Sequence, residues 1–198
     1  ARILQADGRG PSIVFCRTKR TAQKTSDDLA ERGFRAATIH GDLGQSAREK
    51  ALNDFKAGKS DVLIATDVAA RGIDIDGITH VINYQCPEDE KTYVHRIGRT
   101  ARAGAHGIAV TFVDWDELAR WKMIDTALVL GLPEPLETYS SSEHLYEMLN
   151  IPAGSTGRIV KAKPAAAVAP KAAKPAAAKQ ESAPRVKRER TRTKRISS

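Results

Sequence analysis

Three arginines, Arg96, Arg99 and Arg102, follow one another at three-residue intervals within the stretch 93–104. On a helical turn, side chains at this spacing leave from neighbouring positions on one face, where like charges repel one another. A planar guanidinium group offers several fixed donors to phosphate oxygens, so a bound anion would favour the arrangement. The alternative is a solvated basic patch at the end of a helix. The three arginines are therefore a candidate anion site.

A second candidate stretch, residues 65–75, joins polar side chains to a glycine. Thr66 and Asp67 directly follow an apolar run, and Asp74 follows Gly72. Glycine lets a backbone approach a ligand closely. Asp and Thr can also simply cap the amides of their own turn, so both interpretations stay open.

A third candidate stretch begins at His40 and continues through Gly41 to Arg48. A glycine-bearing loop that opens a helix presents free amides and the positive end of the helix dipole, which together suit a phosphate group. Arg48 stands in the first helical turn, where acids are normally preferred. Either a nearby anion or an ion pair with an acid such as Asp54 would explain it.

The elements that must position these residues alternate between strands and helices. Short apolar runs bounded by turn residues are typical of strands buried in a parallel sheet. Such runs predict strands at residues 12–16, 36–40, 61–66, 80–84 and 107–113. Residues 17–32, which end before Gly33, predict the first helix.

Capping pairs predict the later helices. Ser46 with Glu49 has the spacing of a reciprocal capping box, as does Asp114 with Glu117. The first pair predicts a helix that ends at Gly58, and the second predicts a long helix. Two further residues with the same spacing, Ser140 and Glu143, predict a short helix that runs through Leu149.

Strands that alternate with helices at this spacing predict an α/β fold with an open, mainly parallel sheet and helices on both faces. In such sheets the loops after the carboxyl ends of the strands form the binding site. We expect this domain over residues 1–135, a short helical extension over 136–160, and an Ala-, Pro-, Lys- and Arg-rich tail over 161–198.

The tail holds nearly all of the excess positive charge. Residues 161–198 contain 12 Lys and Arg against two Glu, whereas residues 1–160 contain 20 Lys and Arg against 22 Asp and Glu. Few large apolar side chains occur in the tail, so we expect it to be disordered. Its basic run, residues 185–195, is expected to tether RNA without specificity. A solubilising tail and a nuclear-localisation signal are the alternatives.

The remaining composition excludes several classes of protein. Cys16 and Cys86 have no partner motif, so two buried, reduced thiols are expected in place of a disulfide or a metal site. No apolar run has the length of a membrane span, and no export segment opens the sequence. We therefore expect a cytoplasmic protein with no membrane partner.

Taken together, five stretches resemble the carboxy-terminal RecA-like (helicase C) domain of a bacterial DEAD-box ATP-dependent RNA helicase. They occur in the order of that family, between residues 11 and 113. These stretches are residues 13–19, 40–48, 65–75, 81–84 and 95–102.

The resemblance implies roles for residues of the stretches 65–75 and 95–102. Arg99 and Arg102 would be catalytic and would reach the γ-phosphate of ATP held by another domain. Asp74 would accept hydrogen bonds from the ATP ribose. His95 and Arg96 would contact the other domain across the cleft.

The resemblance also implies a grip on the RNA sugar-phosphate backbone that reads no bases. The residues that match this role are Thr18, Gly41, Arg48, Thr66 and Gly72.

Two positions depart from the pattern of the family. Ala101 stands where the family usually has glycine, which would displace Arg102 if the position requires a positive φ. Gln85 stands where relatives often carry an acid, and the change is expected to weaken a contact to the neighbouring domain.

The sequence contains no Gly-x-x-x-x-Gly-Lys-Thr/Ser phosphate loop and no Asp-Glu-Ala-Asp segment. ATP with Mg²⁺ is implied, with the metal ligands expected on a missing amino-terminal RecA-like domain and none on this chain. RNA, ATP and that domain are the implied partners, and the chain alone is expected to be inactive. A DNA helicase or translocase of the same superfamily and a non-catalytic RNA-binding adaptor are the alternatives.

Overall fold

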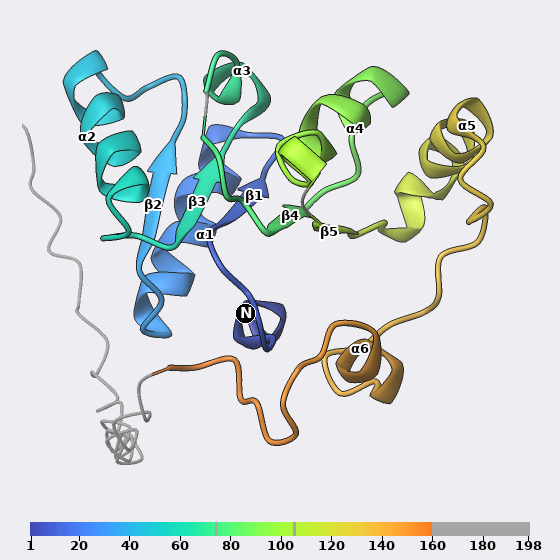
Figure 1. Ribbon diagram of the computed structural model, residues 1–198. Helices are drawn as coiled ribbons and strands as arrows, with labels where there is room; N and C mark the ends of the chain where they lie inside the picture. The colour runs from blue at the N-terminus through green and yellow to red at the C-terminus, as the bar shows by residue number, and fades with distance from the viewer. Residues whose placement is uncertain (74, 105, 160–198) are drawn as a thin grey trace, which may run out of the picture. The chain divides into compact units, whose positions relative to one another are not determined.

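The computed structural model describes residues 1–73, 75–104 and 106–159. Within them, the predicted strands form one five-stranded parallel sheet (Figure 1). The strands are β1 (Ser12–Phe15), β2 (Ala36–Ile39), β3 (Val62–Ala65), β4 (His80–Asn83) and β5 (Ile108–Thr111). Their order across the sheet is β2-β3-β1-β4-β5. The predicted open parallel sheet is confirmed, and each strand is shorter than predicted.

The burial of each strand follows from its place in the sheet. β1 lies at the centre between β3 and β4, and all three are buried along their whole length. The edge strands β2 and β5 are only partly buried. The uninterrupted apolar runs of the central strands are therefore required, because both faces of each strand meet packed helices or loops.

Helices cover both faces of the sheet, as predicted. They are α1 (Lys19–Glu31), α2 (Gln45–Lys56), α3 (Asp67–Ala70), α4 (Glu90–Ile97), α5 (Leu118–Leu128) and α6 (Glu143–Met148). On one face Leu29 of α1 packs in the same cluster as Val14 of β1. On the other face Phe55 of α2 packs in the same cluster as Ile13. Neighbouring residues of β1 thus serve opposite layers, as the alternation of a strand requires.

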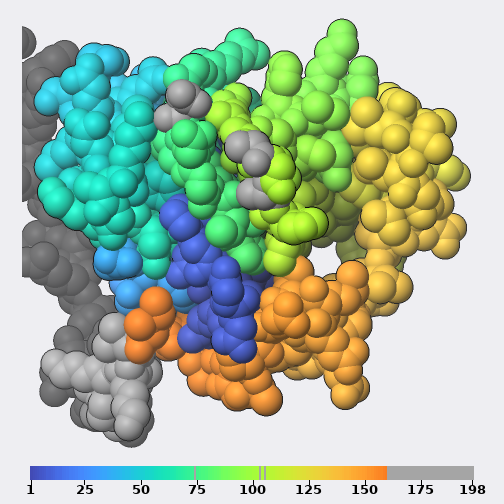
Figure 2. Space-filling model, viewed as in Figure 1, coloured from blue at the N-terminus to red at the C-terminus, as the bar shows by residue number. Residues whose placement is uncertain are grey.

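The carboxy-terminal extension packs onto the α1 side of the sheet. Leu145 and Leu149 contact the core cluster on that face. The backbone N–H of Asp7 donates to Asn150 at 2.8 Å, and that of Ile159 donates to Arg32 at 2.9 Å. The amino-terminal turn and the extension accordingly lie side by side on the surface (Figure 2).

Two of the predicted capping boxes are wrong. α2 begins at Gln45 with Gly44 at its N-cap, and Glu49 accepts a hydrogen bond from the Gln45 side chain at 2.7 Å. α6 begins after Ser142, whose hydroxyl accepts from the backbone N–H of Tyr139 at 2.9 Å. The local hydrogen bonds are formed by Gln45 at the start of α2 and by Ser142 before α6, in place of the predicted caps.

The third capping box is confirmed. Asp114 and Glu117 close the 3₁₀ turn η3 (Trp115–Glu117), which leads directly into α5. The long predicted helix is therefore a short 3₁₀ turn followed by an α-helix.

Two predictions lie outside the described residues, namely the disordered tail over 161–198 and the role of Asp74. Among the residues that the structure describes, no helix is long and apolar enough to cross a bilayer.

Candidate functional site

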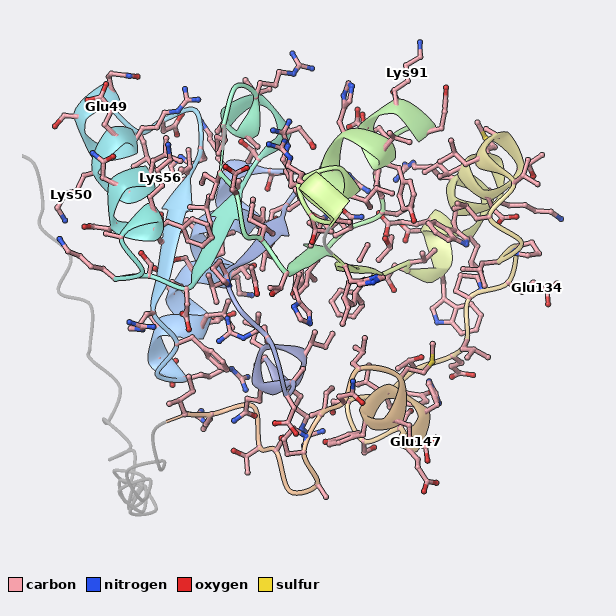
Figure 3. The ribbon with its side chains drawn as sticks, viewed as in Figure 1. Glu49, Lys50, Lys56, Lys91, Glu134 and Glu147 are labelled. Atoms are coloured by element: carbon pink, nitrogen blue, oxygen red, sulfur yellow. The ribbon has the colours of Figure 1, made fainter. Side chains whose placement is uncertain are left out.

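The predicted site residues gather at the carboxyl ends of the strands. Thr18 follows β1, Gly41 follows β2 and Thr66 follows β3, and parallel strands bring these ends to one edge of the sheet. Figure 3 shows the side chains along this edge, with Glu49 of α2 at one end and Lys91 of α4 at the other. This edge is the one where binding sites of open α/β sheets occur.

Arg96 is buried at this edge, and its guanidinium group is paired within the chain. It is 1% exposed. Nε donates to Oδ1 of Asp67 and Nη2 donates to Oδ2, both at 2.7 Å. Nη1 donates to Oδ1 of Asn83 at 3.2 Å and to the carbonyl oxygen of Gln85 at 3.1 Å. The guanidinium carbon also lies 5.3 Å from the centre of the Phe15 ring.

The prediction of three arginines on one helical face is therefore wrong. Arg96 lies in α4, Arg99 follows that helix, and Arg102 begins the 3₁₀ turn η2 (Arg102–Gly104). Arg96 turns into the sheet because the Asp67 carboxylate offers two acceptors there. Like-charge repulsion is relieved by an internal acid.

Arg99 lines a small cavity beside that ion pair. Its Nη1 donates to the carbonyl oxygen of Ile73 at 2.8 Å, and the side chain is partly buried. The cavity has a volume of about 60 Å³, and Asp67, Arg71, His95, Arg96 and Arg99 contribute to its lining. Three guanidinium groups and one imidazole around a single carboxylate form a cation-rich hollow that suits an anion.

Helix geometry partly explains why basic residues occur here. His95 and Arg96 stand in the last turn of α4. The Arg96 cation there interacts favourably with the negative end of the helix dipole, an effect of typically about 0.3–1 kcal/mol. His95 is exposed, so its imidazole remains accessible beside the cavity.

Arg102 follows a residue with an unusual backbone. Ala101 has φ of 56°, in the left-handed region. Residue 101, where the family usually has glycine, therefore does adopt a positive φ. The Nε of Arg102 donates to the carbonyl oxygen of Gly98 at 3.1 Å, which folds the segment back on the end of α4.

Arg48 braces the segment after β3. Its Nη2 donates to the carbonyl oxygens of Ala69 at 3.0 Å and Arg71 at 3.4 Å. The alternative of an ion pair with Asp54 is wrong, because Asp54 pairs with two lysines, at 3.4 and 3.3 Å. The guanidinium group of Arg48 therefore holds the loop that contains the other candidate residues.

Of the polar side chains in that loop that the structure describes, Thr66 and Asp67 do not act as local caps. Thr66 is buried at the N-cap of α3 but makes no side-chain capping bond, and Asp67 turns to Arg96. Gly72 has φ of 72°, a conformation that favours glycine. The interpretation of this stretch as a self-capping turn is therefore not supported by Thr66 and Asp67.

Thr18 and Gly41 lie in two loops that an ion pair connects. Thr18 caps α1 and accepts from the backbone N–H of Thr21 at 3.1 Å. Lys19 donates to Asp42 at 2.9 Å, and this bond lowers the pKa of the Asp42 carboxyl below its usual value. Gly41 has open space around it, so its backbone is accessible.

Gln85 takes a structural place at the edge of the sheet. Its side-chain oxygen accepts from the backbone N–H of Arg17 at 2.9 Å, which ties the ends of β1 and β4 together. An acidic residue could accept the same bond. Glutamine at position 85, where relatives often carry an acid, is thus compatible with the fold.

Sequence reasoning missed the buried acid Glu117 as an organiser of this region. Beyond its capping bond to Asp114, it pairs with Arg17 and accepts from the backbone N–H of Cys86 at 3.2 Å. Cys16 and Cys86 are buried free thiols, as predicted. Burial raises the pKa of both thiols to about 11.

Residues 58–60 form a Gly-Lys-Ser tripeptide. It lies between α2 and β3, at the opposite edge of the sheet. Lys59 pairs with Asp54 at 3.3 Å and Ser60 is buried. Because the tripeptide follows a helix and precedes a strand, it lacks the geometry of a phosphate loop.

Comparison with known proteins agrees with this arrangement. Residues 1–104 match the family described as helicase conserved C-terminal domain. The ATP-dependent RNA helicase CshA of Listeria monocytogenes is 51% identical to this chain over 125 residues, which cover 63% of this chain and 24% of that protein. The chain thus spans about a quarter of the length of the curated relatives that it matches.

Solved structures of DEAD-box proteins have the same fold. The C-terminal domain of the DEAD-box protein Dbp5 is 40% identical with a TM-score of 0.57, covering 61% of this chain and 71% of that one. S. cerevisiae Dbp5 bound to RNA and ADP BeF3 is 34% identical with a TM-score of 0.61, covering 71% and 38%. The chain therefore belongs to the helicase conserved C-terminal domain family, as the carboxy-terminal RecA-like domain of a DEAD-box protein.

Proposed function

We propose that this chain is the second RecA-like domain of an ATP-dependent RNA helicase. The observation that carries the proposal is the shared edge of the sheet, where the cation-rich cavity around Arg99 adjoins the loop that Arg48 braces. Membership of the family and the names of the relatives support it. A structural neighbour that was solved with RNA and ADP BeF3 supports both ligands.

Arg99 and Arg102 are the proposed catalytic residues. Phosphoryl transfer needs charge stabilisation at the transferred group, and an arginine finger typically contributes about 10³ to 10⁵ in rate in related hydrolases. The bond from Arg99 to the Ile73 carbonyl holds that side chain at the cavity. The guanidinium and imidazole donors around the cavity fit phosphate oxygens. ATP would supply the transferable phosphoryl group.

The remaining nucleotide contacts are divided between two domains. Asp74 is proposed to accept hydrogen bonds from the ribose, and it lies outside the described residues. Ligands for Mg²⁺ and the phosphate loop are proposed for an amino-terminal domain that this sequence does not include. We assign the contact with that domain to the exposed His95, because Arg96 is buried and bound to its own chain.

Five residues are proposed to hold the RNA backbone: Thr18, Gly41, Arg48, Thr66 and Gly72. They belong to the loops after β1, β2 and β3 and to the start of α2. Contacts with sugar and phosphate fix the position of a strand without reading its bases, so binding should tolerate changes of sequence.

The experiment compares ATP hydrolysis by this chain with hydrolysis by the same chain joined to its amino-terminal domain, with and without RNA. We expect the joined protein to hydrolyse ATP in an RNA-stimulated manner and the chain alone to show no turnover. In the joined protein, Arg99→Ala should lower kcat by about 10³-fold or more. Turnover by the chain alone, or an unchanged kcat in the variant, would contradict the proposal.

A further inference from the structure

The beginning of the domain packs against its carboxy-terminal extension. We call residues 1–7 the amino-terminal turn and residues 136–159 the strap, which lie side by side in Figure 2. Ile3 and Leu4 of the turn are buried in the same core cluster as Ile151 of the strap. The two segments therefore share one apolar contact, although nearly the whole domain separates them in the sequence.

Hydrogen bonds fix the turn to the strap at two places. The Gln5 side chain donates to the carbonyl oxygen of Arg158 at 3.1 Å and accepts from the backbone N–H of Gly157 at 2.6 Å. Further along, the backbone N–H of Asp7 donates to the carbonyl oxygen of Asn150 at 2.8 Å. Gln5 thus uses both the donor and the acceptor of its amide to hold the strap.

A glycine lets the strap approach the turn closely. Gly157 has φ of 74°, and a Cβ there would lie 3.3 Å from Cβ of Ala1 and 3.5 Å from Cγ of Arg2. Arg2 also donates to the carbonyl oxygen of Ser140, near the other end of the strap. Gly154 has a similar φ of 85°, but a Cβ there would meet open space among the described residues. Of these two glycines, Gly157 is the one that the contact with the turn requires.

The strap is attached by few contacts and is not packed solidly onto the sheet. A cavity of about 460 Å³ is lined by Ile82 of β4, Leu29 of α1 and Leu145 of the strap. On the outer side of the strap, Tyr139 and Met148 are 64% and 69% exposed. Segments with few buried contacts open locally at a lower free energy than the core. Loss of one or two bonds should therefore release the turn from the strap.

In the proposed two-domain protein, the connection from the amino-terminal domain reaches this domain at the turn. A fixed turn sets where the connection ends, whereas a released turn adds up to seven residues to it. Longer flexible connections lower the effective concentration of one domain at the other, roughly as the −3/2 power of their length. We propose that the strap anchors the amino-terminal turn and thereby sets the reach of the connection between the two domains. This inference rests on the function proposed above.

The test uses this chain joined to its amino-terminal domain, with the variant Gln5→Ala, which removes both bonds of the Gln5 amide. The matched control is Gln23→Ala, because Gln23 is an exposed glutamine of α1 whose amide donates to Asp27 at 2.8 Å. Circular dichroism establishes that each variant is folded. A loss of activity in the folded protein then reports on the anchor and not on stability.

A disulfide can restore the anchor in Gln5→Ala. The pair Ala1→Cys and Gly157→Cys places two Cβ atoms about 3.3 Å apart, within a few tenths of an ångström of the separation of about 3.5–4.5 Å that a disulfide requires. The native thiols Cys16 and Cys86 are buried and do not compete. Oxidised and reduced forms of this one protein differ only in whether the strap is bonded to the turn.

Two quantities are measured: amide hydrogen exchange of the peptide that contains Asp7, and kcat/KM for ATP hydrolysis with RNA. In Gln5→Ala we expect exchange at least about 10-fold faster, because two hydrogen bonds are lost. We expect kcat/KM to fall about 2- to 5-fold, because the domains meet less often. Gln23→Ala should match the wild type in both quantities. Oxidation of the cysteine pair should restore both in Gln5→Ala, and reduction should reverse the effect.

Faster exchange with an unchanged kcat/KM would overturn the inference, as would oxidation that fails to restore kcat/KM. If Gln5→Ala leaves exchange unchanged or does not fold, Gly157→Leu replaces it, with Gly154→Leu as its control. Leucine meets the turn at residue 157 and open space at residue 154, and both positions have a positive φ. Unchanged exchange in Gly157→Leu would also overturn the inference. A wild-type protein without RNA-stimulated hydrolysis would refute the proposed function, whereas the exchange data would still show whether the strap holds the turn.

Discussion

Ala101 adopts a backbone conformation that residues other than glycine seldom adopt, with φ of 56°. The left-handed region costs an L-residue roughly 1–2 kcal/mol. Ala101→Gly removes this strain and adds about 0.4–1 kcal/mol of unfolded-state entropy. We expect the free energy of unfolding to rise by about 0.5–1 kcal/mol, measured by urea denaturation of the chain.

The control for this substitution is Ala57→Gly, at an exposed position with an ordinary φ of −78°. There glycine has no strain to relieve, so we expect a loss of about 0.5–1 kcal/mol. Equal losses in the two variants would show that Ala101 is not strained.

His80 is a buried histidine whose pKa is lowered by burial and by the charge of Arg9. Its Nδ1 shares a hydrogen bond of 2.8 Å with Thr79, and Nε2 has no partner among the residues that the structure describes. The unfolded chain therefore takes up this proton at a higher pH than the folded chain. Its contribution to stability is complete above the unfolded value of 6.5 and is lost as the pH falls below it.

We expect the urea midpoint of the wild type to fall between about pH 7 and pH 5, and to fall less in His80→Gln. Other titrating groups are common to both proteins, so the difference between the two profiles isolates His80. Parallel profiles would contradict the assignment.

At the scale of elements, the end of α5 contains a second strained residue. Val129 follows the helix with φ of 52° and is 87% exposed. β-Branched side chains fit the left-handed region poorly, whereas glycine is common just after a helix. Val129→Gly should raise the thermal unfolding midpoint, by about 1 kcal/mol in free energy at that midpoint.

Val129→Ala is the matched comparison, because alanine removes the branch but keeps Cβ. We expect it to recover a smaller part of the gain than glycine does. If alanine and glycine stabilise the chain equally, the branch and not the left-handed conformation causes the strain.

The ends of elements show most clearly what local patterns can predict. Asp114 and Glu117 formed the predicted box because both lie in one turn and need no distant partner. The pair at Ser46 failed because the Gln45 side chain donates to Glu49, and α6 begins after Ser142, whose hydroxyl accepts from Tyr139, so Ser140 lies outside that helix. In α5, Trp121 and Ile124 are buried whereas Met123 is exposed, so these residues show which face of the helix packs inward.

At the scale of the whole molecule, charge is divided between the body and the tail. Residues 1–160 are nearly neutral, and residues 161–198 hold 12 Lys and Arg against two Glu. Binding of single-stranded RNA through cations releases counterions, with a log–log salt slope of about −0.7 per phosphate neutralised. We expect deletion of residues 161–198 to weaken RNA binding at low salt and to make this slope shallower by about two or more.

The control replaces the seven Lys and Arg between residues 185 and 195 by glutamine and retains the length of the tail. It should lower the slope nearly as much as the deletion does, because charge and not chain length drives counterion release. If the RNA affinity and its salt slope are unchanged in both variants, the prediction that the tail tethers RNA is wrong.

The sequence by itself determined the α/β class, the positions of the strands and the residue types at their carboxyl ends. These follow from local patterns, since a buried parallel strand needs an uninterrupted apolar run. The five stretches that resemble the helicase family also occur in the order of that family in the sequence. The order of these stretches therefore predicts the family without the tertiary structure.

Only the tertiary structure decided the order of the strands, the inward turn of Arg96 and the partners of Arg48. Asp67 and Arg96 lie 29 residues apart, and Arg48 and Ala69 lie 21 apart. Whether a charged side chain meets solvent, a ligand or an internal carboxylate depends on which segments the sheet brings together. An interval of three residues between arginines carries no information on that choice, because the deciding partner belongs to another strand.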